Sequence, residues 1–175
     1  MMSLLEGNVT MNRFVLSSFL FVIAVSSLSA QSETPFYKKK YDPKSDPAVD
    51  LRKAIDVAST SGQDILLEVG GEWCVWCHRL DSLFEKNPDL TDFLVKNYLV
   101  LKINVSQENK NEPFLSGFSE IEGYPHLFVL DSNGKLVHSQ DTGALEEGKR
   151  HSRDKVMAFL QQWAPNKHKN NTMVR

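Results

Sequence analysis

Residues 65–77 read ILLEVGGEWCVWC, an apolar segment followed by two glycines and a closely spaced pair of cysteines. The apolar run at 65–69 is short and contains β-branched residues, so it predicts a buried strand, which the glycines end. A helix is expected to begin near Cys74 and to carry Cys77 and Leu80 on one side. The cysteine pair therefore stands where a buried strand passes into a helix.

Cys74 and Cys77 are the only cysteines in the sequence, and their spacing favours redox chemistry over a structural role. A bond between residues three positions apart closes too small a loop to add much to folding stability. Small secreted domains that depend on disulfides use more cysteines at wider spacings. At the first turn of a helix, unpaired backbone N–H groups and the helix dipole favour an anion. Cys74 is therefore predicted to be the attacking thiolate, and Cys77 the more buried thiol that resolves the mixed disulfide.

The other apolar patterns in the chain predict one α/β domain. Strands are expected at 98–105, 126–130 and 135–139, the last two joined by an Asn-Gly turn at 131–134. Helices are expected from Asp46-Pro47 to Gly62, from Asn87-Pro88 onward, around Phe114 to Phe118, and from a cap at Ser152 to Trp163. This order predicts a central mixed sheet of four to five strands with helices on both faces.

The segment Trp73-Cys74-Val75-Trp76-Cys77 resembles the W-C-x-x-C signature of the thioredoxin superfamily. The resemblance covers roughly residues 48–163 and implies the thioredoxin-like fold and the activity of a protein-disulfide reductase or other thiol–disulfide oxidoreductase. It also implies that Tyr124-Pro125 is the family's cis-proline site, facing the dithiol, where the Tyr124 backbone pairs with the substrate peptide. The Cys-Val-x-Cys core and the following Asn-Pro-Asp helix are most similar to exported thiol:disulfide interchange proteins, which favours the reducing direction.

Glu68 lies six residues before Cys74, at the position of the family's buried acid. In the middle of an apolar strand the pKa of this carboxyl should be raised, so Glu68 is a candidate proton acceptor for Cys77. The alternative is that Glu68 faces solvent at a strand edge. Trp73 and Trp76 flank the dithiol as a candidate contact surface for a peptide substrate, with packing as the alternative role for Trp73.

Three other functions fit parts of the motif. Cys74-x-x-Cys77-His78 matches the attachment motif for c-type haem, but no methionine is placed as an obvious second ligand. Metal binding by the two cysteines with His78 or His126 would fall short of the four ligands of a structural zinc site. A thioredoxin-like domain can also be a non-catalytic peptide-binding or chaperone module, although such modules often lack one cysteine. We therefore expect neither a cofactor nor a metal.

The N-terminal part of the 175-residue chain indicates export. Arg13 precedes an apolar run at 14–25 and then small residues, which predicts a signal peptide at 1–30, with Met11 as an alternative start. The apolar run is shorter than a membrane-spanning helix needs. We expect a polar linker at 31–45, a thioredoxin-like domain at 46–164 and a flexible tail at 165–175.

The composition excludes several classes of partner. With 20 Lys and Arg against 22 Asp and Glu, the formal net charge is −2, which gives no reason to expect nucleic acid or an acidic membrane surface. The expected partners are exported proteins that carry disulfides or thiols, together with a redox partner protein that supplies electrons. We expect a periplasmic monomer without stable membrane association after cleavage, with secretion as the second location.

Overall fold

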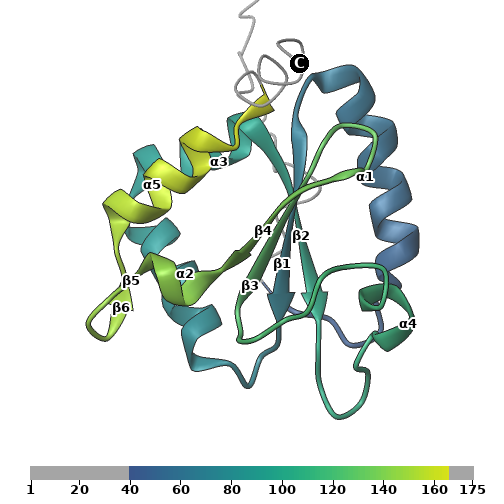
Figure 1. The fold of residues 1–175 in the computed structure, drawn as a ribbon, viewed down its shortest axis with the longest axis horizontal. Coiled ribbons are helices and arrows are strands. Elements are labelled where there is room, and N and C mark those ends of the chain that lie inside the picture. Colours follow the sequence, from purple (N-terminus) through teal and green to yellow (C-terminus); the bar gives the residue numbers. More distant parts are fainter. Residues whose placement is uncertain (1–39, 166–175) are drawn as a thin grey trace, which may run out of the picture. The chain divides into compact units, whose positions relative to one another are not determined.

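The computed structural model describes residues 40–165, which form a four-stranded sheet with helices on both faces (Figure 1). The strands are β1 (Asp64–Gly70), β2 (Tyr98–Asn104), β3 (His126–Leu130) and β4 (Leu136–Asp141). Their order is β2-β1-β3-β4, with β1 parallel to β2 and antiparallel to β3, and β3 antiparallel to β4. The predicted mixed sheet is thus confirmed. The predicted signal peptide, most of the linker and the tail beyond residue 165 lie outside the described residues.

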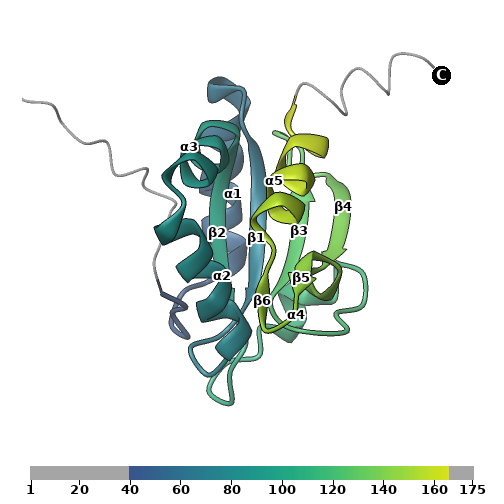
Figure 2. The same cartoon turned by 90° about the vertical axis from the view of Figure 1, so that its left-hand side faces the viewer.

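Two groups of helices cover the two faces of the sheet. The helices are α1 (Pro47–Ser61), α2 (Val75–Lys86), α3 (Pro88–Asn97), α4 (Glu112–Leu115) and α5 (Arg153–Gln162). Helices α2, α3 and α5 pack against one face, and α1 and α4 against the other, on opposite sides of the edge-on sheet in Figure 1. In Figure 2 the first group stands in front of the strands. Within residues 40–165 no helix combines the length and the apolar character needed to cross a membrane.

Alternation along β1 decides which of its side chains face which group of helices. Leu66 packs with α2, α3 and α5, whereas Ile65, Leu67 and Val69 pack with α1. Because successive side chains of a strand point to opposite faces, Glu68 lies on the Leu66 face, toward α2. Strand β1 pairs with β2 on one side and β3 on the other, so the alternative that Glu68 lies at a strand edge is wrong.

The predicted start of α1 is confirmed in detail. The Asp46 side chain accepts hydrogen bonds from the backbone N–H groups of Ala48 (2.9 Å) and Val49 (3.1 Å). The helix ends at Ser61, and the next residue, Gly62, has a φ of 76°, a left-handed conformation that glycine adopts without steric cost.

The predicted N-cap residues of α3 and α5 stand at the N-cap position, but their side chains make no capping hydrogen bond. Asn87 precedes α3, but its side-chain amide donates to the Leu83 carbonyl (2.7 Å) at the end of α2. Ser152 precedes α5, and its side chain makes no capping hydrogen bond. Asn87 therefore stabilises the end of α2. A residue between two helices can bind an unpaired carbonyl of the first helix or an unpaired N–H of the second, because both helix ends carry such groups.

A short hairpin between β4 and α5 was not predicted from the sequence. The 3-10 helix Thr142–Leu145 leads into β5 (Glu146–Glu147), which pairs with β6 (Arg150–His151). Gly148 at the turn has a φ of 64°, in the left-handed region. Strands of two residues are too short for the alternation of apolar and polar residues to be visible. The hairpin lies beside α2, close to the start of α5 (Figure 2).

Replacing Asp46 by Ala should lower the free energy of unfolding by about 1 kcal/mol, because two N–H groups of the first turn of α1 lose their acceptor. Urea titration of the purified protein measures the loss. Ser152→Ala is the matched control and should change the unfolding free energy much less. Equal losses in the two variants would contradict the assignment of Asp46 as the working cap.

Candidate active site

The two cysteines form a disulfide at the beginning of α2. Cys74 is the N-cap residue of this helix, its Cα is 5.3 Å from that of Cys77, and Cys77 is fully buried. The backbone N–H of Cys77 points at Cys74 Sγ from 3.1 Å. A hydrogen-bond donor and the positive end of the helix dipole thus face this sulfur, and both favour its thiolate in the reduced protein. The structure therefore supports Cys74 as the sulfur better suited to attack.

A close approach of the backbone to the dithiol explains the glycine at the end of β1, Gly70. A Cβ atom at Gly70 would overlap Cys77 Sγ and would lie 2.9 Å from the phenol oxygen of Tyr41. The sulfur and the phenol oxygen therefore flank the same point above β1. Tyr41 is buried and packs in one cluster with both cysteines. Its hydroxyl group consequently lies beside the predicted resolving sulfur.

Glu68 is buried in this region, with 3% of its surface exposed. The Tyr41 hydroxyl donates a hydrogen bond to Glu68 Oε1 (2.6 Å), and Lys102 Nζ lies 3.5 Å from the same oxygen. Lys102 also binds both carboxylate oxygens of Asp81 on α2, at 2.5 Å and 2.7 Å. A buried carboxylate is thus connected to a phenol, an ammonium group and a second carboxylate, which satisfies groups that would otherwise be costly to bury.

Burial raises the pKa of the Glu68 carboxyl above its ordinary value. The positive charge of Lys102 and the hydrogen bond from Tyr41 oppose this effect, whereas the charge of Asp81 adds to it. Burial, followed by the charge of Glu68, raises the pKa of the Tyr41 phenol, which keeps its proton and remains a donor. A carboxyl with a raised pKa can exchange a proton under conditions closer to neutrality than a free glutamate can.

Tyr41, Lys102 and Asp81 were not identified as site residues from the sequence. Tyr41 fell in the predicted polar linker, and its bond to Glu68 joins residues 27 positions apart, which no local pattern reveals. For Lys102 the sequence contained one pattern that could have indicated its role. It stands inside the otherwise apolar strand β2 directly opposite Glu68 in the parallel register, where an unpaired lysine would be costly.

Tyr124 and Trp73 form the edge of the site next to Cys74. The Tyr124–Pro125 peptide bond is cis, and Tyr124 packs against the cluster of Tyr41 and the two cysteines. The Trp73 and Tyr124 rings meet edge to face, with centroids 5.5 Å apart. Trp73 is 57% exposed, yet its indole N–H donates to the Val105 carbonyl (2.6 Å). Its ring is therefore held in place and still presents apolar surface to solvent.

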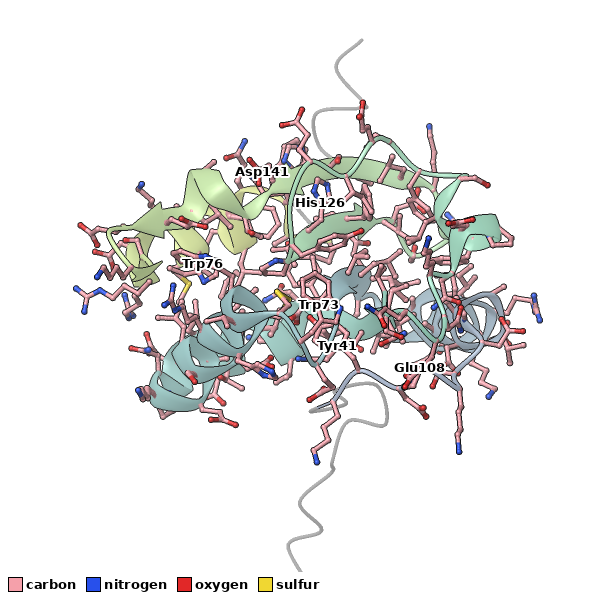
Figure 3. All side chains as sticks on the ribbon, turned by 90° about the horizontal axis from the view of Figure 1, so that it is seen from below. Tyr41, Trp73, Trp76, Glu108, His126 and Asp141 are labelled. Carbon is pink, nitrogen blue, oxygen red and sulfur yellow. A yellow bond between two sulfur atoms is a disulfide. The ribbon has the colours of Figure 1, made fainter. Side chains whose placement is uncertain are left out.

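Trp76 faces away from Trp73, toward the β5–β6 hairpin (Figure 3). Its ring meets the His151 ring edge to face at a centroid distance of 5.4 Å, and the Arg79 guanidinium lies 4.5 Å from its centroid. Trp76 is only half-buried. The two tryptophans thus occupy different sides of the dithiol, and Trp76 connects the disulfide to a basic region of the hairpin.

The two histidines considered as metal ligands have other surroundings. His78 Nε2 lies 2.8 Å from the Glu72 carbonyl, and His126 Nε2 lies 2.8 Å from the Ser139 hydroxyl. His126 is buried, which lowers its pKa. Residues 40–165 contain no group of three or more His, Cys, Asp or Glu side chains arranged to hold a metal ion.

Comparison with known proteins gives matches to disulfide-exchanging proteins. A family model described as thioredoxin-like matches residues 46–132. The thiol:disulfide interchange protein DsbD of Pseudomonas sp. (strain JR1 / K1) is 26% identical over 139 residues, which cover 79% of this chain and 22% of that protein. DsbD of Pseudomonas fluorescens is 27% identical over 115 residues, which cover 65% of this chain and 18% of that protein. The chain thus spans about a fifth of the length of these curated relatives.

Two solved structures extend the comparison to the fold. A disulphide isomerase from Xylella fastidiosa Temecula1 superposes with a TM-score of 0.62 at 25% identity, covering 70% of this chain and 94% of that one. The oxidised C-terminal domain of DsbD from Neisseria meningitidis gives 0.50 at 18% identity, covering 71% and 97%, and this likeness concerns the fold alone. The fold, the family match and the Cys74–Cys77 disulfide at the start of α2 establish that this chain belongs to the thioredoxin superfamily.

Proposed function

We propose that the protein is a thiol–disulfide oxidoreductase that reduces disulfide bonds in exported proteins. The observation that carries this proposal is the asymmetry of the dithiol. Both cysteines are buried, Cys74 at 4% exposed and Cys77 at 0%, but Cys74 Sγ receives a backbone N–H at the start of α2, whereas Cys77 lies beside the hydroxyl group that binds Glu68. One sulfur is thus suited to attack and the other to resolve, as a two-step exchange requires.

In the first step the Cys74 thiolate attacks one sulfur of the substrate disulfide. A bond forms between Cys74 and that sulfur, the substrate disulfide breaks, and the second substrate sulfur leaves as a thiolate that takes up a proton. In the second step Cys77 loses its proton and attacks Cys74 Sγ, which releases the first substrate sulfur. The protein is oxidised to the Cys74–Cys77 disulfide, and the substrate gains two electrons and two protons. A redox partner protein then restores the dithiol.

Glu68 is proposed to receive the proton of Cys77 in the second step. Its carboxyl is held by the Tyr41 hydroxyl, which lies beside Cys77, and its raised pKa makes it a stronger base than an exposed glutamate. Lys102 balances the charge on the carboxylate, and Asp81 in turn pairs with Lys102. Glu68 also favours the reducing direction, because a carboxylate near Cys77 disfavours a second anion there and so destabilises the reduced pair relative to the disulfide.

The substrate is proposed to bind along Trp73, Tyr124 and Pro125. Trp73 supplies exposed apolar surface next to Cys74, and the Tyr124 ring supports it. The backbone of Tyr124 would pair with the extended substrate, as expected from the resemblance to the superfamily. Trp76 is assigned to this surface only at its exposed edge, since Arg79 and His151 cover part of its ring.

The site of action is proposed to be the periplasm, where the protein would act as a monomer after removal of residues 1–30. The N-terminal pattern of one arginine, a short apolar run and small residues supports export. The relatives named as thiol:disulfide interchange proteins support a redox partner protein as the source of electrons.

A Cys77→Ala variant should accumulate a mixed disulfide between Cys74 and its substrates, because nothing resolves the first intermediate. Non-reducing gel electrophoresis and mass spectrometry detect the adduct. Cys74→Ala is the control and should form none. The wild-type protein should also speed the reduction of insulin by dithiothreitol. Absence of the adduct together with no acceleration would leave a peptide-binding module as the better assignment.

The Cys74–Cys77 couple should have a reduction potential below about −250 mV, in the range of reducing thioredoxins. Equilibration with glutathione or dithiothreitol buffers, followed by thiol alkylation, measures this potential. Glu68→Gln should raise it, because the neutral amide no longer disfavours a nearby thiolate. A wild-type value near −120 mV would assign the protein as an oxidant.

The rate of the second step should rise with pH as Glu68 loses its proton, with a midpoint above the ordinary range of a glutamate. Tyr41→Phe removes a hydrogen bond that lowers this pKa, so the midpoint should move to higher pH. Glu68→Gln should abolish this dependence and slow the step by on the order of a hundredfold. Rapid mixing of the dithiol form with a chromogenic disulfide follows the two steps.

The matched control for the pH dependence is Glu85→Gln, which removes an exposed carboxylate from the same helix, α2. This variant should keep the wild-type midpoint and rate. If Glu68→Gln has the same pH profile as the wild-type protein, Glu68 does not take part in the proton transfer, whatever the rate of the variant.

A further inference from the structure

A cavity of about 570 Å³ lies between the C-terminal half of α2, the β5–β6 hairpin and the first residues of α5. Its charged lining is mainly cationic, with Arg79, Lys86, Arg150 and Arg153 against Glu147 and Asp154. The volume is many times the roughly 30 Å³ that one water molecule occupies in the liquid, so a side chain or a short peptide segment fits.

Part of this positive charge is not neutralised by the protein itself. Arg153 binds Asp89 and Asp154. In the part of the chain that the structure describes, Arg79, Lys86 and Arg150 form no ion pair with a carboxylate. Glu147 stands opposite Arg150 in the register of the hairpin and offsets one charge. The cavity therefore retains a net positive charge.

His151 is an unpartnered polar group on the wall of this cavity. Its side chain is 1% exposed, and neither ring nitrogen has a hydrogen-bond partner among residues 40–165. Burial, followed by the positive charge of Arg79, lowers the pKa of His151 to about 4, so the ring is neutral at pH 7 and carries one N–H donor. A buried donor without an acceptor is costly, and such groups in native proteins commonly mark a ligand or water site.

The start of α5 adds further donors to the same wall. Ser152 is the N-cap residue, and its side chain leaves the first-turn N–H groups of α5 without a side-chain acceptor. These groups and the helix dipole favour an anion. The cationic lining, the N–H group of His151 and the first-turn N–H groups of α5 thus all suit an anion, although Asp154 already places one carboxylate in this turn, paired with Arg153.

We propose that this cavity binds a carboxylate side chain of the polypeptide whose disulfide is exchanged. The inference rests on the proposed function and adds a preference for acidic residues near the substrate disulfide. Trp76, which stands between the two cysteines, touches the cavity wall through Arg79 and His151. A polypeptide bound at Cys74 therefore needs to extend only past Trp76 to reach the cations. Arginine recognises carboxylates in bidentate geometry, which suits Glu or Asp.

Three disulfide-bonded peptides that differ only in flanking Glu, Gln or Lys residues provide the kinetic test. The reduced protein should react with the Glu peptide at least about fivefold faster than with the Gln peptide, and with the Lys peptide more slowly. Arg150→Gln should bring the Glu-to-Gln ratio close to one. Arg52→Gln is the matched control, because it removes the same charge from an exposed position of α1 on the opposite face of the sheet, and it should keep the ratio.

A binding measurement separates this inference from the proposed function. A cysteine-free Glu peptide should shift the amide NMR signals of His151, Ser152 and Arg153 in the wild-type protein, and not in Arg150→Gln. Shifts without any reduction of the three disulfide peptides would refute the catalytic function and keep the binding site for acidic side chains. Reduction of the neutral peptide, with no preference and no shifts, would overturn the site alone. Binding of inorganic phosphate at these residues without binding of the peptide would also overturn it.

Discussion

The carboxyl group of Glu68 in the middle of β1 is the constraint on which the rest of this site depends. Glu68 is 3% exposed in a central strand, so the carboxyl must find its hydrogen bonds within the protein. Tyr41 donates a hydrogen bond to it, Lys102 forms an ion pair with it, and Asp81 balances the lysine. Three segments far apart in the chain are thereby tied to one point, on the side of the sheet where α2 presents the dithiol.

The geometry of the dithiol follows from the same junction. Gly70 ends β1 with no side chain, which lets Cys77 and the Tyr41 hydroxyl approach the strand from above. The turn that follows places Cys74 at the N-cap of α2, where its sulfur accepts the N–H of Cys77. Strand, turn and helix thus give the two sulfurs different surroundings before any substrate binds. One accepts a backbone N–H at the start of α2, and the other lies beside the Tyr41 hydroxyl that binds Glu68.

Much of the fold could be predicted from local patterns because its main elements have strong ones. The β1 run, the Asp46 cap and the Gly62 end of α1 follow from short-range chemistry, and the structure confirms them. The position of Glu68 could be predicted from its apolar neighbours. Its partners could not, since their contacts join distant segments. The β5–β6 hairpin was not predicted, because strands of two residues carry no periodicity. The basic cavity that this hairpin lines was therefore not predicted either.

The position of Tyr41 has a consequence for where the working unit of this chain begins. The thioredoxin-like family match starts at residue 46, after the tyrosine, and the first helix among residues 40–165 starts at Pro47. Tyr41 is nevertheless anchored twice, by its phenol on Glu68 and by its backbone N–H on the Glu72 side chain (2.8 Å). A fragment that begins at residue 46 and keeps the rest of the chain would contain every described strand and both cysteines. It would lack Tyr41 and so leave the Glu68 carboxyl open to water. The segment needed for the chemistry therefore begins earlier in the chain than the segment needed for the fold.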